Sequence, residues 1–130
     1  MKHTDTILAI YEAFGRGDVD GILAKLTEDV TWTCNLGSAV PWSGAYSGKA
    51  SVPQFFTAIF DACEVTNFEP LEFVADGDVV VSTGTFGCTV KSTGAKSLAR
   101  WVFLWRFRGD LVCGYEQFHG PELEAAFSAA

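Results

Sequence analysis

One segment constrains the fold more than any other: residues 96–107 carry large apolar side chains at alternating positions. Successive side chains of a β-strand point to opposite faces, so one face of this strand would show Trp101, Phe103, Trp105 and Phe107. The other face would show Leu98, Arg100, Val102, Leu104 and Arg106. A strand with one wet face alternates apolar and polar residues instead. We therefore expect helices over one face and a second subunit, in a symmetric homodimer, over the other.

Helical spacing dominates the first part of the chain. Apolar residues recur at i, i+3, i+4 and i+7 from Ile7 to Phe14, which predicts a helix that ends near Gly15. Asp18 is placed to cap a second, short helix. A third helix is expected from about 49 to 63, with its proline in the first turn, where a missing N–H costs little.

The second part of the chain is typical of strands. A short strand is expected at 29–33, followed by a loop at 35–48 that carries two large aromatic residues. Glycine-containing turns then divide four longer strands, near 65–75, 78–90, 96–107 and 111–119, and a last short helix is expected at 122–127. At 130 residues, without repeats or linkers, the chain is expected to be a single α+β domain over residues 1–130.

Charge and cysteine content exclude several classes of partner. The net charge of −7 argues against nucleic acid and against anionic membranes, because both require a basic face. The four cysteines lack a Cys-x-x-Cys pair and have no histidine at metal-ligand spacing, so neither a zinc site nor a disulfide framework is expected. No apolar leader or membrane-spanning run is present, which predicts a reduced, cytoplasmic protein.

Several short motifs, in this order, resemble SnoaL-like proteins of the nuclear transport factor 2-like superfamily, and the branch related to ketosteroid isomerases in particular. The resemblance spans nearly the whole chain and rests on the stretches at 10–14, 17–21, 26–32, 40–48, 55–56 and 68–73. It implies a curved antiparallel sheet wrapped against three N-terminal helices, an open cone with a deep apolar pocket. Members of this superfamily include isomerases, dehydratases, cyclases, hydrolases and pure binding modules, so the fold alone does not define a reaction.

Of the catalytic residues of better-known relatives, only the last carboxylate of the limonene-type epoxide hydrolases has a counterpart here, Glu116. Where ketosteroid isomerases place their aspartate base, oxyanion-binding tyrosine and protonated aspartate, this sequence has Cys34, Ile10 and Phe103. Where limonene-type epoxide hydrolases hold an arginine and an aspartate on a middle strand, it has Gly84 and Phe86.

Two residues near the end of the last strand are the candidate catalytic pair, Glu116 and His119. If Glu116 points inward among rings, poor solvation raises its pKa and suits it to acid/base work near neutral pH. Alternatively, Glu116 forms an ion pair with Arg100 or Arg106, or faces water. His119 is either a partner for a substrate oxygen or a residue of the rim.

Eight aromatic residues are candidates to line the pocket: Trp32, Trp42, Tyr46, Phe56, Phe60, Trp101, Phe103 and Phe118. The alternative for each is plain packing in the core or in a dimer interface. These observations predict a cofactor-free, metal-free enzyme that isomerises, cyclises, dehydrates or hydrolyses a small apolar or polycyclic molecule. The alternative is a non-catalytic ligand-binding or dimerisation module.

Overall fold

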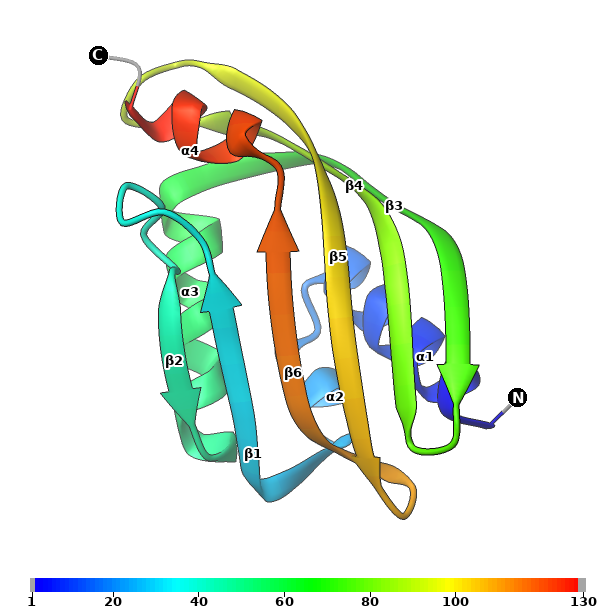
Figure 1. Ribbon diagram of the computed structural model, residues 1–130. Helices are drawn as coiled ribbons and strands as arrows, with labels where there is room; N and C mark the ends of the chain where they lie inside the picture. The colour runs from blue at the N-terminus through cyan, green and yellow to red at the C-terminus, as the bar shows by residue number, and fades with distance from the viewer. Residues whose placement is uncertain (1, 129–130) are drawn as a thin grey trace.

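The computed structural model describes residues 2–128 and is built around one sheet. Within these residues, six strands lie in the order β2-β1-β6-β5-β4-β3 (Figure 1). Their bounds are Leu26–Asn35 for β1, Gly44–Ser47 for β2, Cys63–Asp76 for β3, Val79–Val90 for β4, Lys96–Arg108 for β5 and Leu111–His119 for β6. The α+β class and the four long strands are therefore confirmed.

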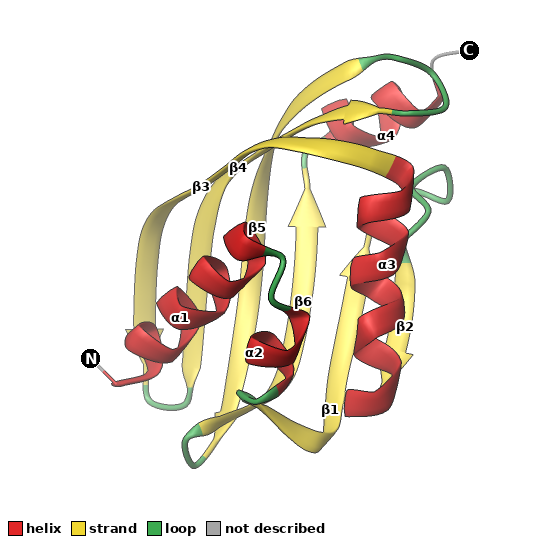
Figure 2. Cartoon of the chain, turned by 180° about the vertical axis from the view of Figure 1, so that it is seen from behind, coloured by secondary structure: helices red, strands yellow, loops and turns green. Residues whose placement is uncertain are grey.

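The helices gather on one face of this sheet, as Figure 2 shows. They are α1 (Lys2–Arg16), α2 (Val19–Leu23) and α3 (Val52–Ala62), and α3 follows a short 3₁₀ turn at Lys49–Ser51. The last helix, α4 (Pro121–Ser128), closes one end of the sheet. The predicted cap of α2 is confirmed, because the backbone N–H of Gly21 donates to Asp18 Oδ1 at 2.9 Å.

Two details of the sheet differ from the expectation. The sheet is mixed, because β1 and β6 pair in parallel while all other neighbours are antiparallel. Strands β3 to β6 form an antiparallel meander. Its last strand, β6, lies beside β1 and runs parallel to it. The expected loop at 35–48 also contains β2, whose residue Tyr46 pairs with Trp32 of β1.

The alternation predicted for β5 is confirmed. Trp101, Phe103, Trp105 and Phe107 are each at most 5% exposed, whereas Leu98 is 63% and Val102 is 42% exposed. The buried rings pack toward the helices and form the centre of the core, where Trp105 Nε1 donates to the Tyr11 hydroxyl at 3.1 Å. Burial of this much aromatic surface is the main source of stability for a domain of this size.

A glycine on β4 allows the core to close around Trp101. Gly84 pairs directly with Trp101 across the sheet. A Cβ atom at position 84 would lie 2.2 Å from the Trp101 ring and 2.4 Å from the carbonyl oxygen of Glu69. The bare backbone of Gly84 therefore makes the space in which this indole lies.

Candidate ligand pocket

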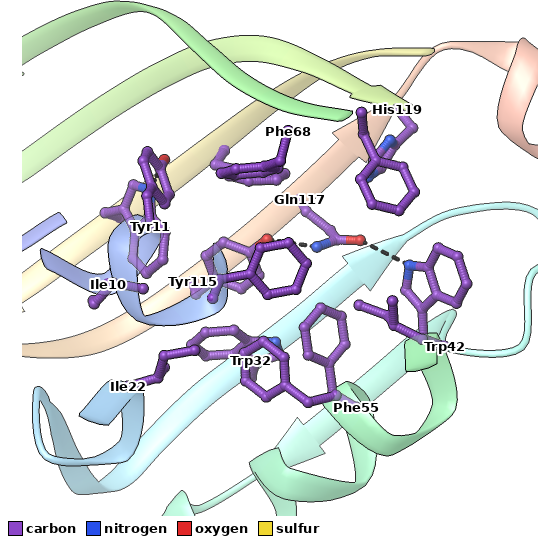
Figure 3. Close-up of a pocket in the computed structure, with 16 residues that line it drawn as sticks. Ile10, Tyr11, Ile22, Trp32, Trp42, Phe55, Phe68, Tyr115, Gln117 and His119 are labelled. Carbon is purple, nitrogen blue, oxygen red and sulfur yellow. Dashed lines mark hydrogen bonds between the residues drawn. The ribbon is translucent and has the colours of Figure 1, made fainter. Parts of the chain in front are cut away.

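A cavity lies between the helix layer and the inner face of the sheet. It has a volume of about 50 Å³, several times the roughly 10–15 Å³ that a single water molecule needs. Helices α1 and α3 contribute Tyr11, Phe14, Phe55 and Phe56, while β5 contributes Phe103 and Trp105. Figure 3 shows members of the lining, among them Tyr11, Phe55 and Tyr115, turned toward a common space.

The cavity lining is apolar and contains no formal charge. Among its sixteen residues there is no Asp, Glu, Lys or Arg. The polar atoms belong to neutral side chains, which are those of Tyr11, Trp32, Trp42, Trp105, Tyr115, Gln117 and His119. An ionic ligand would lose its hydration here without gaining a counter-ion, so the lining favours an uncharged molecule.

Three of these polar residues form a continuous hydrogen-bond chain (Figure 3). Trp42 Nε1 donates to Gln117 Oε1 at 3.2 Å, and Gln117 Nε2 donates to the Tyr115 hydroxyl. The loop between β1 and β2 positions Trp42, because Ser43 Oγ donates to the Leu36 carbonyl at 2.7 Å. All three members of the chain are at most 3% exposed, so water does not compete for these hydrogen bonds.

Both tyrosines of the cavity remain protonated at neutral pH. Burial raises the pKa of Tyr115 well above its ordinary value of 10, and burial likewise raises the pKa of Tyr11. A phenol that keeps its proton can donate a hydrogen bond. The two hydroxyls are thus neutral donors or acceptors in the site and not anions.

His119 lies at the end of β6, beside the rings of Phe86 and Phe103, with centroid distances of 5.7 and 6.2 Å. Burial lowers its pKa to about 4, so the imidazole is neutral at pH 7. Its Nδ1 atom is buried without a hydrogen-bond partner among the described residues. Buried polar atoms nearly always have partners, so this nitrogen is a candidate contact for a ligand.

Half of the predicted site residues line the cavity. The ones that do are Trp32, Trp42, Phe56, Phe103 and His119. The other predicted aromatics lie nearby but outside it. The Tyr46 hydroxyl donates to the Trp42 carbonyl at 3.1 Å, and Trp101 is buried in the core, stacked on Phe103 at 3.9 Å. Phe60 lines a neighbouring outer groove, and Phe118 is 43% exposed.

The position of Glu116 corrects one expectation. Tyr115, Gln117 and His119 line the cavity, so the alternation of β6 turns Glu116 to the outer face with Phe118. The pairing of β5 with β6 shifts register between Arg106 and Phe107, and this β-bulge changes the phase of alternation along β6. Within residues 2–128, Glu116 also forms no ion pair, so it is not held by Arg100 or Arg106.

The sequence analysis overlooked Gln117. The signal that could have identified it is a glutamine among aromatic residues, two positions after Tyr115 on a strand expected to be buried. A buried amide needs specific hydrogen-bond partners. Its partner Trp42 is 75 residues away in sequence, and only the folded chain brings the two together.

Comparison with known proteins supports the fold independently of these details. The family model described as the SnoaL-like domain matches residues 7–115, which include both strands that pair with β6 and the first residues of the cavity on α1. The chain belongs to the SnoaL-like domain family. A comparison with curated proteins gives no significant match.

Solved structures similar to this SnoaL-like protein cover nearly its whole length. An NTF2-like protein of unknown function from Burkholderia pseudomallei is 27% identical, with a TM-score of 0.88 and coverage of 99% of both chains. TerC, co-crystallised with polyporic acid, is 23% identical with a TM-score of 0.85, over 99% of this chain and 100% of TerC. A candidate polyketide cyclase from Xanthomonas campestris is 21% identical with a TM-score of 0.81, over 97% and 96%. These likenesses confirm the NTF2-like fold.

Over the described residues 2–128, no three His, Cys, Asp or Glu side chains are grouped as metal ligands. In the same part of the chain, no helix has the length and apolar character to cross a membrane.

Proposed function

We propose that the cavity binds a small, uncharged, ring-containing molecule with a carbonyl group, and that His119 moves a proton on it without a cofactor. The observation that carries this proposal is the unpartnered Nδ1 of a neutral His119 in a lining that has no charge. The reaction class is isomerisation, cyclisation or dehydration by acid/base catalysis.

The ligand class follows from the lining. Rings from several elements surround the space, and such walls favour flat apolar groups. The TerC structure with polyporic acid supports small-molecule binding in this fold. The name of the Xanthomonas campestris neighbour supports chemistry on polyketide-type substrates.

The proton transfer uses His119 as the base. The imidazole takes a proton from the carbon next to the carbonyl, the C–H electron pair forms a C=C bond, and the carbonyl π pair moves to oxygen. A base with a pKa near 4 is weak when isolated. Proton transfer creates the imidazolium and the enolate together, and their attraction offsets the cost of burying each charge. The proton returns to another atom of the substrate in an isomerisation.

The test is exchange of the α-protons of 2-indanone, a neutral bicyclic ketone, in deuterated water, followed by NMR. The protein should accelerate the exchange, and His119→Gln should reduce that acceleration by about 100-fold or more. Because only the neutral imidazole accepts a proton, the rate should be constant above pH 5 and decline as the pH falls through about 4. Full exchange activity in His119→Gln would contradict the assignment.

A second candidate function is ligand binding without catalysis. It is favoured by the absence of any carboxylate among the lining residues, now that Glu116 lies on the outer face. In this case the protein would bind 2-indanone, and the exchange rate would equal that of the solution without protein.

The outer face of the sheet supports the proposal of a homodimer. Val102 of β5 and Phe118 of β6 are directly paired and both more than 40% exposed. Arg100, Arg106 and Glu116 share this face, so a symmetric partner can place a carboxylate of one copy near a guanidinium of the other. We propose that two copies pack through this face.

A further inference from the structure

The hydrogen-bond chain from Trp42 to Tyr115 has only one possible direction. An indole N–H donates and never accepts, so the atom of Gln117 that faces Trp42 must be the amide oxygen. The amide nitrogen then faces Tyr115, and an NH₂ group can only donate to the hydroxyl oxygen. The usual ambiguity between the two ends of a glutamine amide is therefore removed here by chemistry.

This direction leaves the proton of the Tyr115 hydroxyl available. The hydroxyl oxygen already accepts from Gln117, and the hydrogen bonds of the described residues provide no acceptor for its proton. Burial keeps this proton on the oxygen at neutral pH. A buried donor without an acceptor is costly unless another molecule supplies one.

The ring of Tyr115 is fixed by its neighbours. Its centroid lies 4.0 Å from that of Trp32, 4.5 Å from that of Trp105 and 5.3 Å from that of Phe103. The hydroxyl therefore keeps one position. A rigid donor whose oxygen already accepts a hydrogen bond is polarised, and it binds an acceptor more strongly than an isolated phenol does.

From this geometry we infer that Tyr115 donates a hydrogen bond to the ligand's carbonyl oxygen, and that Gln117 and Trp42 act as positioning residues that fix its direction. The site thereby selects a molecule that presents an acceptor oxygen over the matching hydrocarbon. The inference rests on the proposed function, because it assumes that the cavity is occupied by a neutral small molecule. In the proton transfer described above, the same hydrogen bond would stabilise the enolate oxygen.

The test compares 2-indanone with indane, which has the same ring system and no oxygen, by NMR titration of each ligand. The wild-type protein should bind the ketone about tenfold more tightly than the hydrocarbon, the value expected of one buried hydrogen bond. Tyr115→Phe removes only the hydroxyl, so it should abolish this preference and leave indane binding within about twofold. A preference that survives in Tyr115→Phe would overturn the inference.

The role of Gln117 is tested by reversing its polarity. In Gln117→Glu the introduced carboxyl, once ionised, accepts from both neighbours and takes the Tyr115 proton away from the ligand. Burial raises the pKa of such a carboxyl, so the preference for 2-indanone should decrease between about pH 6 and 9, as the carboxyl ionises. The nearby titratable groups do not interfere, because burial raises the pKa of Tyr11, Tyr115 and Cys34 and lowers that of His119 to about 4.

The matched control is Gln54→Glu, the same substitution at the chain's other glutamine, which is exposed on α3. It adds the same charge outside the cavity, so the preference of this variant for 2-indanone over indane should not change with pH. The melting temperature of Gln117→Glu against pH shows when its carboxyl ionises, and an unchanged preference across that ionisation would overturn the role of Gln117.

The two ligands also separate this inference from the proposed function. If both bind with equal affinity, the cavity is occupied as proposed and only the hydrogen bond from Tyr115 is excluded. If neither binds, the proposed function itself fails.

Discussion

At the scale of single residues, the cavity works with neutral groups. Its polar side chains are phenols, indoles, one amide and one imidazole, and burial keeps each of the titratable ones uncharged at pH 7. Such a site can still do acid/base chemistry, because the charges that form during a proton transfer form together and attract one another in a low-dielectric space. The same burial has a measurable consequence for stability.

The neutral His119 should make the fold sensitive to acid. Its pKa is lowered from 6.5 to about 4 by burial, so the unfolded chain takes up a proton first as the pH falls. Stability is unaffected above pH 6.5 and declines between 6.5 and 4, by about 3 kcal/mol. In His119→Gln this part of the decline should be missing. Urea denaturation of both proteins across this pH range measures it, and identical curves would contradict the buried, neutral state of His119.

At the scale of secondary structure elements, the sheet depends on close approach at one glycine. Gly84→Ala would put a methyl group 2.2 Å from the Trp101 ring and 2.4 Å from a backbone carbonyl. We expect a loss of about 2 kcal/mol or more in the free energy of unfolding, because neither the fixed indole nor the backbone can move freely. Denaturant titration gives the value.

The control for this substitution is Gly15→Ala. Gly15 lies in α1, and a Cβ there meets nothing within 4 Å. Alanine should be neutral or stabilising by about 0.5–1 kcal/mol, since it loses less conformational entropy in a helix than glycine. Equal effects at the two positions would mean that the contact with Trp101 does not limit the packing of β4.

The elements also show what could be predicted from the sequence. The strands β3 to β6 were predictable because each alternates apolar side chains between glycine-containing turns, and α1 because its apolar residues repeat at helical spacing. The parallel pairing of β1 with β6 was not, since it is set by the order of distant strands. Nor was the bulge that turns Gln117 inward and Glu116 outward, because both phases of alternation along β6 carry an aromatic residue, Tyr115 in one and Phe118 in the other, and the sequence does not show where the phase changes. For the site, four of the lining aromatic residues and His119 could be named in advance, but neither Gln117 nor its hydrogen bond with Trp42 could.

At the scale of the whole molecule, the sheet separates two surfaces for which we propose different tasks. The inner face holds the cavity, and the outer face presents Val102 and Phe118 to solvent or to a second copy. Val102→Lys should convert a dimer to a monomer in analytical ultracentrifugation, because it places a charge in the centre of the proposed interface. The matched control is Leu8→Lys on α1, which is 41% exposed compared with 42% for Val102. A dimer that persists in Val102→Lys would exclude this face as the interface.

The central claim is that the cavity accepts a neutral ring-containing molecule, and the most direct measurement is a thermal-shift titration with two ligands of the same shape. One is 2-indanone, and the other is indane-2-carboxylate, which carries a negative charge at pH 7. A ligand that binds only the folded state raises the melting temperature. The account predicts a concentration-dependent rise with 2-indanone and none with the carboxylate, because the lining offers no cation. No rise with the ketone, or an equal rise with the anion, would contradict it.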